Sequence, residues 1–367
     1  MHLYSLTLQQ ATAIQKAIYG NFSGPKVQEL LVSRGKYLEL IRLEENTNKI
    51  QIIHSQEVFG LIRNICAFRL TGASRDYIIL TSDSGRVVIL QFDPEKNCFQ
   101  KIHQESYGKT GCRRIVPGQY LAVDPKGRAF MIAAVEKQKF VYILNRDSQA
   151  KLTISSPLEA HKSHTLIFDI CGIDVGYENP LFACIESDYG EPDAKDSATY
   201  TGIMKKTLTF YEMDLGLNHV VRKNMEEIHL SAHMLIPIHG SQDGPGGLVI
   251  CCEGFLVYKS MVGGKELRVP FPRRVGAPTD RNMIINCFAA HKQKVLIFLY
   301  FCKIFEKDLF FFLLQTEIGD ILKMSMQFTQ EEVHNVQLQY FDSIPSALSL
   351  CIIKTGFLFS ACEFGNQ

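Results

Sequence analysis

The chain has 367 residues, of which 46% are hydrophobic and 21% are charged. This composition is far too apolar for a disordered chain and is sufficient for a large buried core. The 39 Lys and Arg residues are balanced by 38 Asp and Glu residues. A domain that grips phosphate backbones usually carries a clear basic excess, so this balance disfavours nucleic-acid binding as the main activity.

Residues 1–15 contain no charged segment followed by an apolar run and a small-residue cleavage site, so we expect no signal peptide. Eleven cysteines are scattered through the chain, mostly inside apolar runs, which indicates buried thiols in a reducing compartment rather than a disulfide framework. A strand would place the adjacent Cys251 and Cys252 on opposite faces. The absence of a CxxC pair argues against a structural zinc site.

The commonest local pattern is a run of β-branched, aromatic and leucine residues, a polar turn, and a second such run, which is typical of a β-hairpin. The hairpin units are 30–41, 77–90, 120–135, 181–186 with 207–213, 248–258, 310–324 and 357–367. The tips of five units carry Gly35, Gly85, Gly127, Gly254 and Gly319, and glycine adopts the positive φ of a tight turn easily. One hairpin cannot bury its own apolar face, and repetition of such units is typical of propeller blades of roughly 40–50 residues.

The sequence therefore predicts an all-β, WD40-like, seven-bladed β-propeller over residues 1–367. A β-sandwich or two smaller β domains are the alternative. The seventh hairpin reaches Gly365 and then the sequence stops. We therefore expect the last blade to be incomplete and to lack its return strand: either another segment, such as residues 3–8, supplies this strand, or the sequence is a fragment.

An apolar stretch at 295–314 is about as long as a membrane-spanning helix. Charged residues stand in its middle, and each would cost about 2.5–3.5 kcal/mol at the centre of a bilayer. These residues are Lys303, Glu306, Lys307 and Asp308. We therefore predict two apolar strands joined by a polar turn at 303–308, and no membrane insertion.

The search for catalytic and ligand-binding motifs finds no complete constellation. Gly108, Lys109 and Thr110 end like a phosphate-binding loop, but that motif needs a glycine where His103 stands. Two histidine pairs have spacings that a metal could use on a helix but lack the carboxylate of HExxH: His161 with His164, and His229 with His233. No GxSxG elbow occurs. We expect no catalytic residue, no bound metal and no cofactor.

Two basic stretches are candidates for an interaction surface. One contains Arg113 and Arg114, and the other contains Arg273 and Arg274 on a proline-bearing loop. A solvated surface is the simpler interpretation. The alternative is a partner contact, because arginine is enriched where interfaces need paired hydrogen bonds.

Long collinear runs of this sequence carry a resemblance to a known family. They include GNFSGPKVQELLVSRGK from Gly20, VFGLIRNICAFRLTG from Val58, DYIILTSDSGRVVIL from Asp76, GCRRIVPGQYLAVDPKGRAFMIAAVEKQKFVYILNRD from Gly111, LTFYEMDLGLNHVVRK from Leu208 and KTGFLFSACEFGN from Lys354. The chain resembles the large multi-propeller scaffold subunits of the splicing factor 3b complex, the cleavage-and-polyadenylation factor and the damage-specific DNA-binding complex. The splicing factor 3b branch is the most similar.

The resemblance implies three seven-bladed propellers and a helical C-terminal domain in a much longer protein, of which this chain holds most of the first propeller. It implies a nuclear scaffold without enzymatic chemistry that supports branch-site recognition in pre-mRNA splicing. The implied partners are a HEAT-repeat subunit and small zinc-finger and helical subunits, with pre-mRNA and snRNA contacted indirectly and no small-molecule substrate. The alternatives are a DNA- or RNA-binding propeller module and a ubiquitin-ligase adaptor.

One segment departs from the family pattern. In the family, the HKQK run at 291–294 leads almost directly into the strand that here begins near Leu309. Residues 295–307 intervene, and we expect them to be an insertion, either a translated intron or an error in the gene model.

Overall fold

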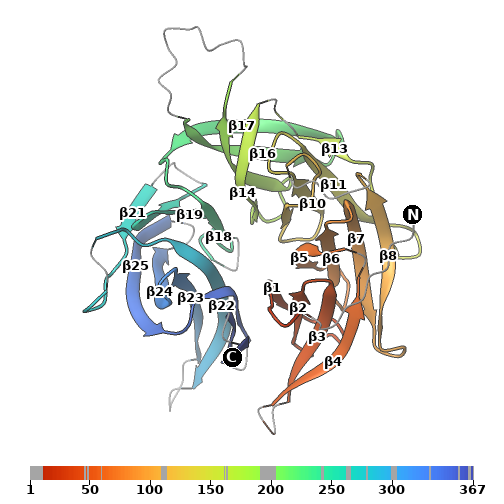
Figure 1. Cartoon of the computed structure of the whole chain (residues 1–367), viewed down its shortest axis with the longest axis horizontal. Coiled ribbons are helices and arrows are strands. Elements are labelled where there is room, and N and C mark those ends of the chain that lie inside the picture. Colours follow the sequence, from red (N-terminus) through yellow and green to blue (C-terminus); the bar gives the residue numbers. More distant parts are fainter. Residues whose placement is uncertain are drawn as a thin grey trace, which may run out of the picture.

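The structure is a computed structural model that describes residues 11–366, with gaps and with the backbone alone at 292–309 and 365–366. The gaps are 45–46, 48, 59, 109–113, 161, 163, 191–203, 241–243, 262–265, 278–279, 299–303, 330–331, 354–355 and 363–364. Every regular element in the described part is a β-strand. The strands form seven antiparallel sheets that follow one another around a common centre (Figure 1).

The first three sheets are blades 1 to 3. Blade 1 contains β1 (Lys16–Gly20), β2 (Glu29–Arg34), β3 (Tyr37–Glu44) and β4 (Lys49–Glu57). Blade 2 contains β5 (Ile62–Phe68), β6 (Tyr77–Ser82), β7 (Arg86–Asp93) and β8 (Cys98–Ser106). Blade 3 contains β9 (Tyr120–Val123), β10 (Ala129–Ala133) and β11 (Lys139–Arg146), and its outer position is divided between β12 (Leu152–Ile154) and β13 (Leu158–Glu159).

The other four sheets are blades 4 to 7. Blade 4 contains β14 (Thr165–Ile173), β15 (Leu181–Asp188), β16 (Lys206–Asp214) and β17 (His219–Ile228). Blade 5 contains β18 (Met234–Pro237), β19 (Leu248–Cys252), β20 (Phe255–Lys259) and β21 (Glu266–Pro270). Blade 6 contains β22 (Ile285–Phe298), β23 (Ile304–Thr316), β24 (Asp320–Thr329) and β25 (Glu332–Ser343). Blade 7 contains β26 (Ala347–Ile352), β27 (Leu358–Cys362) and β28 (Gly365–Asn366).

Each of the seven predicted hairpins lies in a different blade, so the predicted repeat is confirmed. The glycines at the five predicted tips have φ between +56° and +90°, the left-handed region that glycine adopts without strain. In all blades but one, the predicted hairpin joins the second and third strands; in blade 3 it joins β9 and β10.

The predicted ending of blade 7 needs a small correction. Gly365 and Asn366 form a short third strand that pairs with Cys362 and Ala361 of β27, so a return strand begins. The described part of blade 7 still has three strands where the other blades have four positions, and the prediction of an incomplete blade is confirmed. Residues 3–8, which could supply the fourth strand, lie outside the described residues.

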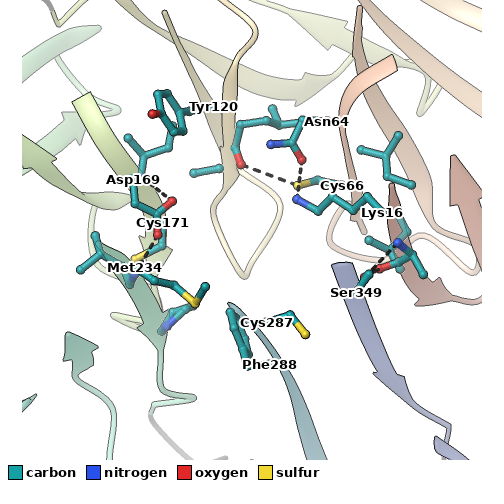
Figure 2. A pocket seen from close by; sticks show the side chains of 18 of the residues that line it. Lys16, Asn64, Cys66, Tyr120, Asp169, Cys171, Met234, Cys287, Phe288 and Ser349 are labelled. Carbon is teal, nitrogen blue, oxygen red and sulfur yellow. Dashed lines mark hydrogen bonds between the residues drawn. The ribbon is translucent and has the colours of Figure 1, made fainter. Parts of the chain in front are cut away.

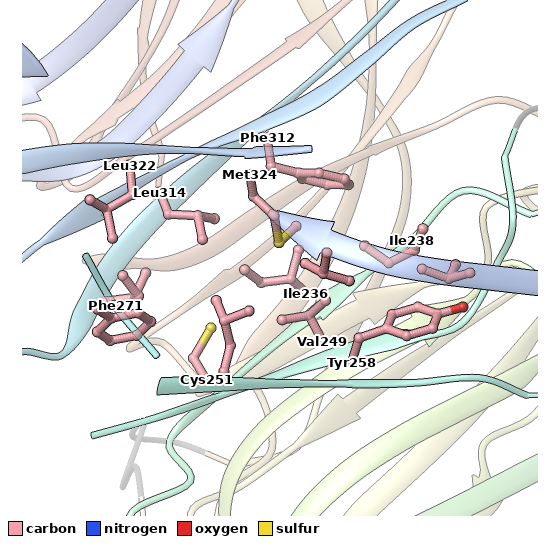
Figure 3. Packing of buried hydrophobic residues seen from close by; sticks show 14 of the residues in the cluster. Ile236, Ile238, Val249, Cys251, Tyr258, Phe271, Phe312, Leu314, Leu322 and Met324 are labelled. Atoms are coloured by element: carbon pink, nitrogen blue, oxygen red, sulfur yellow. The ribbon is translucent and has the colours of Figure 1, made fainter. Parts of the chain in front are cut away.

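A separate apolar cluster lies between each pair of neighbouring blades. Figure 3 shows the cluster between blades 5 and 6, where Ile236 and Val249 face Phe312 and Leu314. The cluster between blades 7 and 1 joins Phe359 to residues of the first blade and closes the ring. Burying one such side chain contributes about 1.5–3 kcal/mol. The blades therefore hold one another together, because no single sheet covers its own apolar faces.

The adjacent cysteines follow this arrangement. Cys251 lies in the cluster between blades 5 and 6, whereas Cys252 lies in the cluster between blades 4 and 5. The prediction that these two side chains lie on opposite faces of a strand is confirmed, because they pack into different clusters.

The apolar stretch at 295–314 lies in the hairpin of β22 and β23, as expected, but the predicted position of its turn is wrong. The two strands remain paired as far as Phe298 and Ile304, so most of the segment 303–308 belongs to β23. The backbone pairing of β22 with β23 continues through Glu306, Lys307 and Asp308, so these charged residues do not form the turn. Because the described part contains no helix, it contains none that could span a membrane.

Candidate functional sites in the central channel and the arginine loops

The innermost strands of all seven blades surround a cavity of about 680 Å³ (Figure 2). Its wall includes Lys16 of β1, Tyr120 of β9, Asp169 of β14, Phe288 of β22 and Ser349 of β26. The size falls in the range of ligand pockets, so the polar groups of the wall decide whether this channel needs a ligand.

Side chains of the wall connect each innermost strand to the next one around the ring. The bridges are Lys16 Nζ to Asn64 Oδ1, Cys66 Sγ to Leu121 O, Tyr120 Oη to Ile167 O, Asp169 Oδ2 to Leu235 N, His233 Nε2 to Ile285 O, Cys287 Sγ to Ala347 O, and Ser349 Oγ to Ala17 N. All seven junctions therefore carry such a bond. These polar side chains hydrogen-bond to the neighbouring strands of the ring. They therefore help to hold the blades together.

Asp169 is the one carboxylate among these bridges. Its Oδ2 accepts the Leu235 N–H at 2.7 Å, and its Oδ1 accepts the Ile170 N–H at 2.9 Å. Burial raises the pKa of this carboxyl to about 6, although both backbone donors and Lys16 act in the opposite direction. The junction between blades 4 and 5 therefore contains a charge that is costly above this pKa.

The cysteines of the channel wall are unsuited to nucleophilic chemistry. Burial raises the pKa of Cys287 and of Cys351 to about 12, and it raises that of Cys171 well above the ordinary value. Because the thiolate is the reactive form, these protonated thiols act as packing residues. No group of three or more His, Cys, Asp or Glu side chains that could hold a metal occurs among the described residues.

The predicted arginines lie on two separate connections between blades. Arg114 lies between β8 and β9, and Arg273 and Arg274 lie between β21 and β22. Arg113 lies outside the described residues. The two connections join blades 2 and 3 and blades 5 and 6, so among the described residues Arg114 lies on a different connection from Arg273 and Arg274.

The arginine side chains differ in their surroundings. Arg114 is largely exposed and pairs with Glu136. Arg274 Nε lies 2.7 Å from Oδ1 of Asp320, a buried carboxylate, so this arginine neutralises a charge of the fold. Arg273 donates from Nη2 to the carbonyl oxygen of Arg281 at 3.0 Å and to Asn282 Oδ1 at 3.4 Å.

One buried ion pair could not be found from the sequence. Lys139 of β11 and Glu186 of β15 form an ion pair between blades 3 and 4, with both side chains almost completely buried. The Tyr211 hydroxyl donates to Glu186, and the Lys139 ammonium lies 5.1 Å from the centre of the Tyr211 ring. The sequence signal is a charged residue next to an apolar run in each strand, which many surface residues share.

These features define a class of protein, a β-propeller whose innermost strands are joined to one another by hydrogen bonds around a central channel. Residues 13–367 match the family model described as RSE1/DDB1/CPSF1 first beta-propeller. The chain is 54% identical to "Splicing factor 3B subunit 3" of Danio rerio and to "Spliceosome-associated protein 130 A" of Arabidopsis thaliana, and 53% identical to the Drosophila melanogaster protein of the former name. In each comparison 100% of this chain matches 29% of the relative.

The chain therefore belongs to the RSE1/DDB1/CPSF1 propeller family. It resembles the N-terminal portion of the splicing relatives and spans 29% of their length.

Proposed function

We propose that this chain is a non-enzymatic protein-interaction scaffold that acts in pre-mRNA splicing, as the first propeller of a multi-propeller protein. The observation that carries the proposal is the match of the whole chain to relatives named as splicing factors, at 53–54% identity. The polar side chains of the channel wall hydrogen-bond to neighbouring innermost strands, and burial raises the pKa values of the wall's thiols. Both observations support a binding role rather than a catalytic one.

The proposed location is the nucleus, and the proposed partners are protein subunits of the splicing factor 3b complex, namely a HEAT-repeat subunit and small zinc-finger and helical subunits. Pre-mRNA and snRNA would be contacted indirectly. A DNA- or RNA-binding module has less support, because Arg274 is paired with buried Asp320 and the basic stretches lie on different connections.

The test is affinity purification of the tagged full-length protein from nuclear extract, with mass spectrometry of the recovered proteins. We expect spliceosomal subunits. Recovery of a cullin ubiquitin ligase in their place would contradict the proposal. A salt titration of RNA binding tests the nucleic-acid-binding alternative. Several phosphate contacts would make the affinity for RNA fall steeply as the salt concentration rises.

A further inference from the structure

Two side chains of opposite charge line the central channel. Lys16 of β1 and Asp169 of β14 are the only Lys, Arg, Asp or Glu residues in the described part of the channel wall. They belong to blades 1 and 4 and lie across the channel from each other (Figure 2). Among the described residues, no ion pair joins either of them to the other or to a third side chain. The channel therefore presents one cation and one anion to whatever enters it.

Both charged groups can bind a further partner. The Lys16 ammonium has three N–H donors, and one of them binds Asn64 Oδ1. The Asp169 carboxylate can accept about four hydrogen bonds, and it accepts those of the Leu235 and Ile170 N–H groups. Burial disfavours the charged form of this carboxylate and raises its pKa. A cation bound at Asp169 would therefore offset a cost that the fold already carries.

Large apolar side chains occupy much of the wall besides the two charges. Phe168, Met234 and Phe288 are half-buried residues of this wall. Tyr19 is 41% exposed and Leu348 is 60% exposed, so solvent reaches the wall. The cavity volume of about 680 Å³ falls in the range of pockets for small ligands. The channel therefore suits a small ligand whose body is apolar.

We propose that the central channel binds a small zwitterionic ligand with an apolar body, the class of molecule to which short free peptides belong. Its ammonium group pairs with Asp169, its carboxylate pairs with Lys16, and its body packs against the aromatic wall. The two wall charges select this class, because a purely anionic ligand would meet the Asp169 carboxylate and a purely cationic one would meet the Lys16 ammonium. This inference goes beyond the proposed scaffold function and does not rest on it.

The test measures peptide binding to the purified full-length protein by isothermal titration calorimetry. The probes are Leu-Leu, Leu-Gly-Leu and Leu-Gly-Gly-Leu with free ends, because each added residue lengthens the distance between the end charges by up to about 3.3–3.6 Å. The probe that binds most tightly is then compared with two capped forms of itself. N-acetylation removes the ammonium group, and C-terminal amidation removes the carboxylate.

Two variants of the protein remove the matching wall charges. Asp169→Asn removes the anion and keeps an oxygen acceptor, and Lys16→Met removes the cation and keeps an unbranched side chain. The control is Lys36→Met, because Lys36 is an exposed lysine of the turn between β2 and β3 and does not line the channel. Thermal unfolding of each variant checks that the fold is retained.

We expect each cap to weaken binding to the wild-type protein by at least about tenfold, because it removes a charged hydrogen-bonding group. Acetylation should have no further effect on binding to Asp169→Asn, and amidation none on binding to Lys16→Met, whereas Lys36→Met should behave like the wild type.

Three results would overturn the proposal: no probe binds the wild type, capped and free probes bind equally, or the folded variants respond to the caps as the wild type does. If a variant does not fold, the capped probes on the wild type still decide. Recovery of spliceosomal subunits is measured separately, so the scaffold function and the channel ligand can fail independently.

Discussion

Ser349 of β26 binds both backbone polar groups of Ala17 in β1, although the two residues are 332 positions apart. The Ala17 N–H donates to Ser349 Oγ at 3.0 Å, and Ser349 Oγ donates to the Ala17 carbonyl oxygen at 3.2 Å. Both residues are buried. One hydroxyl therefore joins the innermost strands of the last and first blades.

Replacing Ser349 with alanine should weaken this closure. The change leaves a buried N–H and a buried carbonyl oxygen without this partner, and such loss costs about 1–3 kcal/mol. We expect the urea midpoint to fall accordingly. Ser346→Ala is the control, because Ser346 is an exposed serine just before β26 whose hydroxyl accepts an exposed hydrogen bond from Asn286, and its loss should cost less than about 0.5 kcal/mol. Equal effects of the two changes would show that the Ala17 contact does not stabilise the ring.

Asp169 should make stability fall as pH rises from about 4 to about 6. Its pKa is raised from 3.8 to about 6 in the fold, so the folded state binds more protons than the unfolded state in this window. Above it, the buried carboxylate costs about 3 kcal/mol, from roughly 1.4 kcal/mol for each pH unit. We expect urea unfolding at pH 4, 5, 6 and 7.5 to reveal this trend.

Asp169→Asn provides the comparison for this trend, because it removes the titrating group and keeps the shape. The difference in unfolding free energy between wild type and variant should change with pH across the same window and level off above it. A difference that is constant with pH would contradict the shifted pKa.

The ion pair of Lys139 and Glu186 should tolerate joint replacement better than single replacement. Lys139→Met leaves Glu186 as an uncompensated buried charge, which costs about 3–5 kcal/mol. Lys139→Met with Glu186→Leu removes both charges, so stability should recover most of that loss. Denaturant unfolding of the two single variants and the double variant measures the coupling. Additive losses would mean that the two charges do not interact.

Gly85 should not tolerate a larger residue. It has φ +68°, and an added Cβ would lie 2.8 Å from the Gly108 carbonyl oxygen. Gly85→Val should therefore lower stability by about 1–3 kcal/mol, measured by thermal unfolding. Gly190→Val is the matched control, because Gly190 has φ +70° but nothing within 4 Å of an added Cβ. A smaller loss of stability for Gly190→Val than for Gly85→Val would show how much the clash adds to the backbone strain. An unchanged melting temperature for Gly85→Val would refute the prediction.

The repeating hairpins made the propeller predictable, since local apolar alternation and glycine turns such as Gly35 and Gly319 are short-range signals. The contacts between blades were not predictable in this way. Ser349 meets Ala17 only after the ring has closed, and Lys139 meets Glu186 only after blades 3 and 4 have packed against each other. The two arginine stretches look alike in sequence, but in the structure Arg274 neutralises buried Asp320, whereas Arg114 is largely exposed.

The last prediction concerns residues 295–307, which we propose to be an insertion. Their ends are cross-strand partners, because Val295 pairs with Lys307. Deleting the whole segment would leave Lys294 and Asp308 as a two-residue loop closed by the pair of Gln293 and Leu309. Two-residue loops are the commonest hairpin connections. We therefore expect the shortened chain to keep its fold.

Removing this apolar segment should also raise the soluble fraction, since uncharged windows such as 295–301 promote aggregation when exposed. The measurements are soluble yield and monomer content by size-exclusion chromatography. A shorter deletion tests whether the loop alone matters. Deleting 296–306 leaves Val295 and Lys307 as a two-residue loop between the paired Lys294 and Asp308, so this chain should keep its fold as the full deletion does. An intact chain that is a stable monomer, together with a full deletion that unfolds it, would show that the segment is a required part of blade 6.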